Sequence, residues 1–466
     1  MAKVITQQTF DDVVRENMSE FDMSPEEAVA DAVQQFESQG VNLLNIVKDA
    51  GLYSGDNESM EHPVLAAMNR LKISLDNTDN EDEIKSSLKT IKTECEIDLA
   101  RRCMAGKKAY ELLMRSLQQN KQNATMVNEN LLVLIALTDG QPDLLDYPGM
   151  NLCVELLDIY NQNAEVLELV IRFIKTTCIR HEDNRQAFVK LKLINKLSEI
   201  LEKNKNNGCV VKETCAALRT LTLDDDIRVP FGQAHEHAKM IVTEGNALKT
   251  ILDICKVYSS DPDVLSELFA TISKLVVRDE FCKAVMDMGG LELIFGAFQQ
   301  SINDKGIVKQ ALGVTKALAG NDNVKIAVVN SGGIDVILAA MTKHQANAKI
   351  AELGCATIAA IVLRNPSHCD KTIESNGHHV ILQAMKIHRI EAGVQKQACM
   401  AIRNLVARTR EHCAAILELG AETLINEARR CHKSCADDSK AALRDLGCQV
   451  DLQELWKGEK PGLAQE

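Results

Sequence analysis

Apolar residues recur along this chain at helical spacing, and the helices they predict fall into units of nearly constant length. Glycines preceded by small or polar residues mark the junctions between units. Most junctions are 43 to 45 residues apart, and one interval of 96 residues spans two units. The junction glycines are Gly106, Gly149, Gly245, Gly290, Gly333, Gly377 and Gly420. A period of this length predicts a solenoid in which each unit packs on its neighbours.

Each unit contains three amphipathic segments separated by turns. In one clear copy, a short segment at 324–333 ends in a glycine, a medium segment follows at 334–344, and a long Ala-rich segment covers 348–363. The terminal glycine suits a left-handed cap on the short helix. The long segment has apolar residues on most of its faces, which is typical of the interior layer of a solenoid. We therefore expect a short, a medium and a long helix in each unit.

The interval of 96 residues contains a junction without glycine, near Leu191–Lys192. The unit after this junction is about ten residues too long, which places an insertion near 224–238. The insertion begins with three aspartates and contains Pro230 and Gly232. Because extra residues in a solenoid emerge on one edge without breaking the stack, we interpret it as a tolerated surface loop. The alternative is a loop that contacts a partner.

The best copy of the long segment reads QACMAIRNL, at 397–405. With the small-residue and glycine junctions, it resembles the armadillo repeat, and the resemblance covers about 106–448. HEAT repeats have a similar period but only two helices, so the separate short helix before each glycine favours the armadillo type. We predict an all-α, armadillo-like, right-handed solenoid of about eight three-helix units, preceded by a helical N-terminal region.

The first part of the chain does not follow the repeat. Residues 24–27, Ser-Pro-Glu-Glu, combine an N-cap, a proline in the first turn and a capping-box glutamate, so a helix is predicted from there to Gly40. A further helix is expected at 41–50, and an acidic loop at 76–83 introduces a helix at about 81–104. We interpret this region as a polar cap of the solenoid, the alternative being an acidic docking segment. The predicted divisions are an acidic helical region at 1–80, a repeat solenoid at 81–448 and a tail at 449–466.

The chain has 466 residues and a net charge of −13, most of which lies in residues 1–105, with 21 acids and 10 bases. This balance argues against nucleic acid and anionic membranes as partners. No apolar run is long enough for a transmembrane helix, and the first residues lack the apolar segment of a secretory signal. We therefore expect a monomer in the cytoplasm and/or nucleus, with its fifteen cysteines reduced.

Motifs for catalysis are missing from the sequence. Neither a nucleotide-binding glycine loop, a G-x-S-x-G elbow nor H-E-x-x-H occurs, so we expect no enzyme activity and no cofactor. Some cysteines and histidines lie close together, namely Cys431, His432 and Cys435, His412 and Cys413, and His235 and His237. A zinc site needs four converging ligands, usually with C-x-x-C pairs, and this chain has no such pair. We therefore expect no metal.

The resemblance implies a ligand surface on the long third helices, which in armadillo proteins line a concave face that binds an extended peptide. In an importin-α type of groove, a ladder of Asn and Trp side chains holds the peptide. Asn404 occupies the Asn position in one unit. The equivalent residues in other units are Thr220, Lys274, Ala317 and Ala360, and no Trp lies in the repeats. A receptor for nuclear signals is therefore not expected.

Basic residues recur near these positions about once per unit. They are Arg219, Lys274, Lys316 and Arg403. A β-catenin type of groove grips an acidic extended peptide with such a row, and because one exposed ion pair contributes only about 0–1 kcal/mol, several must act in register. These four cations and Asn404 are our candidate partner-binding residues. The alternative is that they are ordinary solvated side chains.

We predict from these features a non-enzymatic scaffold or adaptor that binds a protein partner, with an acidic extended segment lying along the concave face. The alternative is a chaperone-like assembly adaptor that uses other surfaces of the solenoid. Groove residues distinguish the two, because only the first depends on the row of cations.

Overall fold

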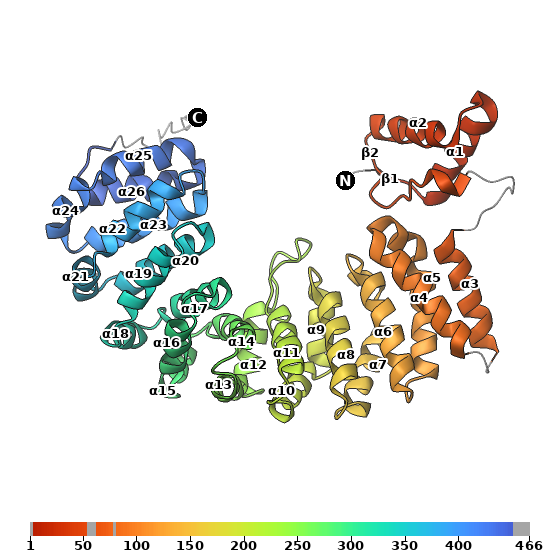
Figure 1. Ribbon diagram of the computed structural model, residues 1–466, viewed down its shortest axis with the longest axis horizontal. Coiled ribbons are helices and arrows are strands. Elements are labelled where there is room, and N and C mark those ends of the chain that lie inside the picture. The colour runs from red at the N-terminus through yellow and green to blue at the C-terminus, as the bar shows by residue number, and fades with distance from the viewer. Residues whose placement is uncertain (1–2, 54–61, 78–80, 451–466) are drawn as a thin grey trace, which may run out of the picture. The chain divides into compact units, whose positions relative to one another are not determined.

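The computed structural model describes residues 3–53, 62–77 and 81–450, and the chain forms two compact units, Met1–Ala247 (unit 1) and Leu248–Glu466 (unit 2). The described ranges hold 26 α-helices, four short 3₁₀ helices and one pair of two-residue strands (Figure 1). Within each unit the helices stack in repeating groups, which confirms the predicted all-α armadillo-like solenoid. In these ranges no single helix has the length and apolarity to cross a membrane, and only α18 (Asp322–Asn330) and α19 (Gly333–Lys343) together, across a 74° bend, reach that composition.

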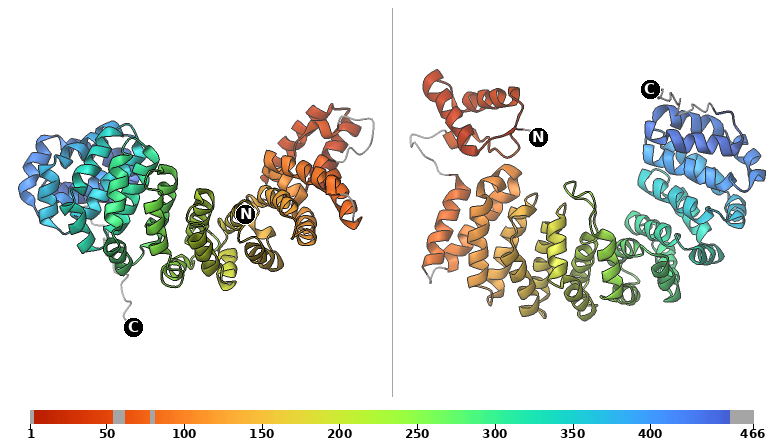
Figure 2. Two further views of the ribbon diagram at one scale, coloured as in Figure 1. Left: turned by 60° about the horizontal axis from the view of Figure 1, so that its bottom comes forward. Right: turned by 180° about the vertical axis from the view of Figure 1, so that it is seen from behind.

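In unit 2, short first helices, medium second helices and longer third helices follow one another in a regular order (Figure 2). The helices are α13 (Ala247–Val257), α14 (Pro262–Leu275), α15 (Asp279–Asp287), α16 (Gly290–Gln300), α17 (Lys305–Leu318), α18 (Asp322–Asn330), α19 (Gly333–Lys343), α20 (Ala348–Val362), α21 (Pro366–Glu374), α22 (Gly377–Ile387), α23 (Ala392–Val406), η3 (Arg410–His412), α24 (Cys413–Glu418), α25 (Ala421–Cys431), η4 (Lys433–Cys435) and α26 (Ala436–Leu446).

Unit 1 combines a small N-terminal subdomain with the earlier repeats. Its elements are β1 (Lys3–Val4), α1 (Gln7–Phe21), α2 (Pro25–Ser38), β2 (Val41–Asn42), η1 (Ala50–Tyr53), α3 (Pro63–Asp76), α4 (Glu81–Ile97), α5 (Leu99–Gln119), α6 (Ala124–Thr138), η2 (Pro142–Leu144), α7 (Tyr147–Ile159), α8 (Ala164–Cys178), α9 (Glu182–Lys190), α10 (Leu193–Lys203), α11 (Gly208–Thr220) and α12 (Ala234–Thr243).

Third helices begin at an asparagine or aspartate in most repeats. The side-chain oxygen of each cap accepts a hydrogen bond from a backbone N–H two or three residues further on. Such a cap satisfies one of the N–H groups that a helix start leaves without a partner. The caps are Asn123, Asn163, Asn207, Asp261, Asp304 and Asn347. The polar turn before each long segment is thus a signal for where the third helix starts.

The junctions of unit 2 differ from the prediction by one residue in three repeats. The left-handed backbone falls on the residue before the predicted glycine, at Gly289, Gly332 and Asn376, with φ of 77°, 75° and 59°. The predicted glycine instead begins the second helix, where a Cβ would lie 2.7 to 2.9 Å from a carbonyl oxygen of the first helix. These glycines are Gly290, Gly333 and Gly377. They are needed for close packing rather than for a positive φ.

Unit 1 contains the less regular junctions. Lys192 has the left-handed φ of 64°, which confirms the predicted junction without glycine, and Gly106 is left-handed as well. Gly149 is different, because it lies in the first turn of α7, where a Cβ would meet the Tyr110 hydroxyl at 2.3 Å. The long loop between α11 and α12 coincides with most of the predicted insertion at 224–238.

Successive third helices pack on one another within each unit, α6 on α8 and α8 on α11 in unit 1, and α14 on α17 through to α26 in unit 2. Their cores include buried cysteines, and all fifteen cysteines are free thiols. Burial raises the pKa of Cys355 and of Cys399 to about 12, so both remain protonated and pack as small apolar groups.

Three histidines of unit 2 join neighbouring repeats where the second helices end. They are spaced 44 residues apart, and each imidazole donates its Nε2–H to a backbone carbonyl in the preceding repeat. The contacts are His344 Nε2 to Ile302 O at 2.7 Å, His388 Nε2 to Gln345 O at 2.8 Å and His432 Nε2 to Arg389 O at 2.8 Å. Of these three histidines, only His432 was among the cysteines and histidines considered in the sequence.

The N-terminal subdomain contains one predicted helix and lacks another. Ser24 and Glu27 form the complete capping box of α2, as predicted. The prediction of a helix at 41–50 is wrong, because Val41 and Asn42 form a strand parallel to Lys3–Val4. Polar side chains hold the backbone that follows in a non-helical path. The bonds are Leu44 N to Asn42 Oδ1 at 2.9 Å, Asn45 Nδ2 to Ile5 O at 3.0 Å and Val47 N to Gln7 Oε1 at 2.8 Å.

Helices on either side of the predicted boundary at residue 80 pack together, since α3 contacts both α4 and α5. The helix expected at about 81–104 ends earlier, because α4 stops at Ile97 and the Asp98 side chain caps α5. The predicted acidic loop lies partly outside the described residues, as does most of the predicted tail at 449–466.

Candidate functional site

The predicted row of cations is divided between the two units. Lys274 on α14, Lys316 on α17 and Arg403 on α23 belong to unit 2 and are exposed, whereas Arg219 on α11 belongs to unit 1 and is half-buried. All four lie near the C-terminal end of a third helix, 12 or 13 residues after its N-cap. Equivalent positions in adjacent packed helices bring side chains of unit 2 to one surface.

Arg403 and Asn404 already contact protein groups. The Nε of Arg403 lies 3.4 Å from the Oδ2 of Asp445, whose side chain is largely buried. The Nδ2 of Asn404 donates to the carbonyl oxygen of Ala359 at 2.9 Å, in the last turn of α20. Asn404 therefore joins two repeats through the amide hydrogens that an importin-α type of groove would direct toward a peptide.

Lysines without ion pairs gather on α14 and α17. Within the described ranges, neither Lys274 nor Lys316 forms a salt bridge, and α17 adds Lys305 and Lys309, which also lack one. Residues 309 and 316 lie two turns apart on one side of the helix. We call Lys274, Lys305, Lys309 and Lys316 the lysine face. Sequence reasoning missed Lys305 and Lys309, although their spacing of four residues indicates a shared side of one helix.

A glycine lies within the lysine face. Gly313 is inside α17, between Lys309 and Lys316, and a Cβ at this position would meet no atom within 4 Å. Neither a positive φ nor close packing therefore requires a glycine here. A glycine inside a helix costs about 1 kcal/mol relative to alanine. Because glycine has no side chain, another chain can approach the α17 backbone closely at this position.

Unit 1 neutralises its equivalent cations. Lys175 of α8 lies at the position of Lys316, and its Nζ is 2.6 Å from the Oε2 of Glu213 on the next third helix. Arg172 lies 3.1 Å from the Oε1 of Glu213 and also pairs with Glu168. Lys175, the α8 equivalent of Lys316, is therefore already neutralised by a carboxylate of the protein.

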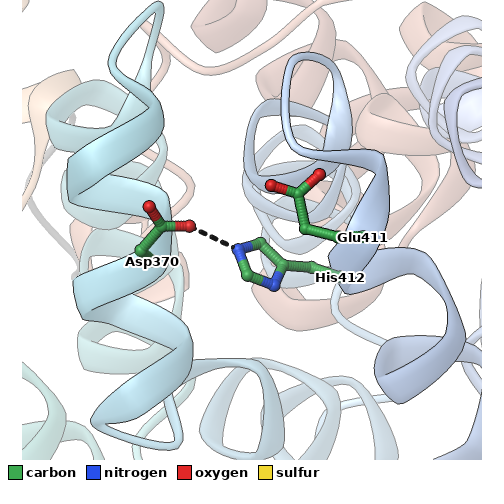
Figure 3. A group of neighbouring side chains, drawn as sticks. All are labelled: Asp370, Glu411 and His412. Carbon is green, nitrogen blue, oxygen red and sulfur yellow. Dashed lines mark hydrogen bonds and ion pairs between the residues drawn. The ribbon is translucent and has the colours of Figure 1, made fainter.

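One group of side chains has the composition of a metal site. Asp370 of α21 and Glu411 and His412 of η3 bring their ligand atoms within 4.8 Å of one another (Figure 3). The Nε2 of His412 lies 2.7 Å from the Oδ1 of Asp370. In the described part of the chain no fourth His, Cys, Asp or Glu joins this group, whereas a structural zinc site has four ligands.

Similar contacts between first helices explain the geometry of this group without an ion. His181 Nε2 lies 2.7 Å from Asp143 Oδ1, and Asn321 Nδ2 donates to Asp279 Oδ1 at 2.8 Å. In each pair, a residue at or before the start of a first helix reaches an aspartate of the preceding repeat. The His412–Asp370 pair belongs to this series of inter-repeat contacts.

The other predicted metal candidates point to separate carbonyl groups. His432 contacts Arg389 O, the Sγ of Cys435 lies 3.4 Å from Ala392 O, and Cys431 is exposed. The remaining contacts are Cys413 Sγ to Asp445 O at 3.7 Å and His237 Nδ1 to Leu221 O at 2.9 Å. Their side chains are thus held by different backbone groups rather than directed at one point.

Two family profiles together match almost the whole chain. Residues 2–63 match the Armadillo repeat-containing protein 6 N-terminal domain, and residues 64–465 match the ARMC6 profile. The chain is 48% identical to the human protein named Armadillo repeat-containing protein 6, over 100% of this chain and 95% of that one. It is 44% identical to the Drosophila melanogaster homolog, over 98% of both chains.

Solved structures share the fold at low sequence identity. An engineered protein superimposes with a TM-score of 0.59 and 16% identity, over 84% of this chain and 100% of that chain. A chain from a study titled as a phosphorylation switch in the interaction between cadherin and β-catenin gives a TM-score of 0.54 and 14% identity, over 82% of this chain and 69% of that chain. These similarities concern the fold alone.

Proposed function

Because this chain belongs to the ARMC6 family of armadillo-repeat proteins, we propose that it is a non-catalytic scaffold that binds an acidic, extended segment of another protein along the third helices of unit 2. The family and the fold are typical of protein-binding scaffolds. The observation that carries the proposal is the lysine face, where four cations lie on two adjacent third helices without acidic partners in the described ranges.

The spacing of the lysine face indicates the spacing of acidic residues in the ligand. Packed helices lie about 8–10 Å apart, which equals about three residues of a chain in the polyproline II conformation, at about 3.1 Å each and with every third side chain on the same side. A segment with an acidic residue at about every third position would therefore pair with Lys274 and then with Lys316. Gly313 leaves room for the backbone of this segment between Lys309 and Lys316. Arg403 and Asn404 remain proposed extensions of this site in unit 2, and Arg219 of unit 1 remains a separate candidate.

A peptide titration tests the proposal. The probe is a fluorescein-labelled peptide of twelve residues with Glu at every third position, titrated with full-length protein at about 0.15 M salt. The Lys274→Glu/Lys309→Glu/Lys316→Glu variant should bind at least about 10-fold more weakly. The matched control is Lys283→Glu/Lys343→Glu/Lys386→Glu, which makes the same charge change on the first and second helices of unit 2. An equal loss in both variants, or none in either, would contradict a specific site.

A second variant separates close approach from charge. Gly313→Leu leaves every lysine in place but fills the open space above the α17 backbone. We expect weaker binding of the same peptide with unchanged or higher stability, because leucine is a better helix former than glycine. Unchanged affinity would show that the peptide does not cross α17 at this point.

A further inference from the structure

The loop between α11 and α12 is built differently from the other repeat connections. It runs from the end of α11 at Thr220 to the start of α12 at Ala234, and it extends beyond the neighbouring helices (Figures 1 and 2). The loop lies wholly in unit 1. Some of its polar residues, such as Thr222 and Asp226, are buried against the repeat, and two of its largest apolar residues are exposed to solvent.

A buried ion cluster holds the first part of the loop. Arg185 on α9 is only 1% exposed, and its Nη1 lies 2.6 Å from the Oδ1 of Asp225 in the loop. The Nε of Arg185 lies 2.8 Å from the Oε2 of Glu182, which is equally buried. Burial by itself would raise the pKa of Glu182, but the hydrogen bonds donated by Gln233 N–H, Gln186 and Arg185 outweigh it and lower the pKa.

Asp226 anchors the middle of the loop. Its Oδ2 accepts a hydrogen bond from the backbone N–H of Glu182 at 2.9 Å, and its Oδ1 lies 2.9 Å from the Nε of Arg228. Arg228 in turn places its Nη1 2.9 Å from the Oδ1 of Asp143, in an earlier repeat. The hydrogen bond from Arg228 holds the pKa of Asp226 well below its usual range, so the anchor is ionised at neutral pH.

The end of the loop returns to the same cluster. The backbone N–H of Gln233 donates to Glu182 Oε1 at 2.7 Å. A Cβ on Gly232 would lie 2.9 Å from the Asp224 carboxylate and 3.4 Å from that of Glu182, so the backbone here must pass very close to both. Both ends of the loop and its middle are therefore fixed to α9.

Two large apolar residues between these anchors are exposed in the part of the chain that the structure describes. Ile227 is 100% exposed and Phe231 is 90% exposed, although Asp226 beside Ile227 is buried. A tolerated surface loop normally shows the opposite pattern, with polar side chains outward. Holding such residues in a fixed conformation removes much of the entropy loss that binding would otherwise cause.

We propose that Ile227 and Phe231 are the anchors of a second protein-binding site, and that the partner presents an apolar pocket rimmed by basic side chains. The rim follows from charge complementarity, because the exposed Asp224 beside the anchors forms no ion pair in the described residues, whereas Asp143 is paired with Arg228. A few side chains that fill pockets on the partner usually provide most of the binding energy of an interface. This site is independent of the lysine face and makes the protein a two-site adaptor.

Photo-crosslinking from the loop identifies the partner's surface. The full-length chain is expressed in cultured cells with benzoylphenylalanine in place of Ile227 or Phe231, and the cross-linked peptides are sequenced. The control carries the same group in place of Ile390, which is 86% exposed at a turn of unit 2. We expect both loop positions, and not the control, to link to one apolar segment flanked by Lys or Arg. Links to acidic or polar segments, links only to a second copy of this chain, or no links above the control would overturn the proposal.

The purified partner then gives a quantitative test. Ile227→Ser/Phe231→Ser should bind it at least about 10-fold more weakly than wild type, whereas Ile390→Ser should bind as wild type. Thermal unfolding of both variants should match wild type, because the replaced side chains are solvated. The Lys274→Glu/Lys309→Glu/Lys316→Glu variant should retain this partner, which separates the failure of this site from that of the lysine face. Equal affinity of wild type and the loop variant would refute the role of the anchors.

Discussion

The third helices of the two units carry cations at equivalent positions in different surroundings. In unit 1, Arg172 and Lys175 on α8 face Glu213 of α11, six residues after that helix's N-cap. In unit 2, Lys316 on α17 is followed by α20, where the residue six positions after the N-cap is Leu353. One acidic residue, Glu213, thus distinguishes the neutralised surface of α8 from the lysine face.

This difference teaches that a repeat position does not by itself define a binding residue. The next repeat decides whether a cation stabilises the stack or remains available to a ligand. In unit 1, charged side chains mainly pair with other side chains of the protein. The loop between α11 and α12 is the clearest case, because the arginine that it contacts, Arg185, is fully buried. In unit 2, hydrogen bonds from His344, His388 and His432 to backbone carbonyls also join the repeats, beside ion pairs such as that of Arg403 with Asp445.

The largest expected effect comes from the buried charge of unit 1. Arg185→Met would leave Glu182 and Asp225 without their cation, and breaking a buried ion pair costs about 3–5 kcal/mol. The matched change in unit 2, Lys309→Met, should alter stability by less than about 0.5 kcal/mol. Hydrogen exchange of the α9 and α17 backbones in the full-length protein measures each effect locally. Similar losses for the two variants would remove the contrast between the units.

A smaller effect is expected from the histidine contacts of unit 2. His388→Ala leaves the carbonyl of Gln345 without its donor, which costs about 1–3 kcal/mol for a group away from water. Since this contact joins an imidazole to a backbone carbonyl, we expect the loss to change little between low and high salt. Chemical denaturation at two salt concentrations measures it, with His379→Ala on the same helix as the exposed control. A loss as small as that of the control would mean that packing alone joins these repeats.

The variant with the smallest expected effect on stability tests the difference between the two units most directly. Glu213→Gln removes the acid shared by Arg172 and Lys175 and should lower stability by only about 0–1 kcal/mol, because the pairs are partly exposed. It should also create a second site for the acidic twelve-residue peptide, seen as protection of α8 from hydrogen exchange. Glu199→Gln, which removes an exposed acid from α10, serves as the control. No new protection of α8 would show that unpaired cations are insufficient for binding.

Much of the fold could be predicted from local features of the sequence. The glycine period, the asparagine and aspartate caps and the Ala-rich third segments each act within one repeat, so they indicate helices without knowledge of the neighbours. The prediction was wrong where distant residues compete with local preference. Val41 and Asn42 form a strand because Lys3 and Val4 offer a backbone partner, and three junction glycines serve packing against Val285, Val328 and Thr372.

The candidate site was less accessible to sequence reasoning. Lys274 and Lys316 were proposed from their repeat positions, and the four-residue spacing of Lys305 and Lys309 was overlooked, but the open side of α17 at Gly313 became visible only in the structure. Arg403 and Asn404 looked equivalent to free groove residues, and their contacts with Asp445 and Ala359 come from helices 42 and 45 residues away.

The sequence by itself determined the helical class, the repeat period and the place of the insertion, because hydrophobic spacing, caps and turn residues act over a few positions. Only the tertiary structure decided which charges are neutralised and which side chains face solvent. The partners of Lys175 and Arg185 lie 38 and 40 residues away along the chain. Stacking brings them within 2.6 Å, and ion pairing depends on that distance in space.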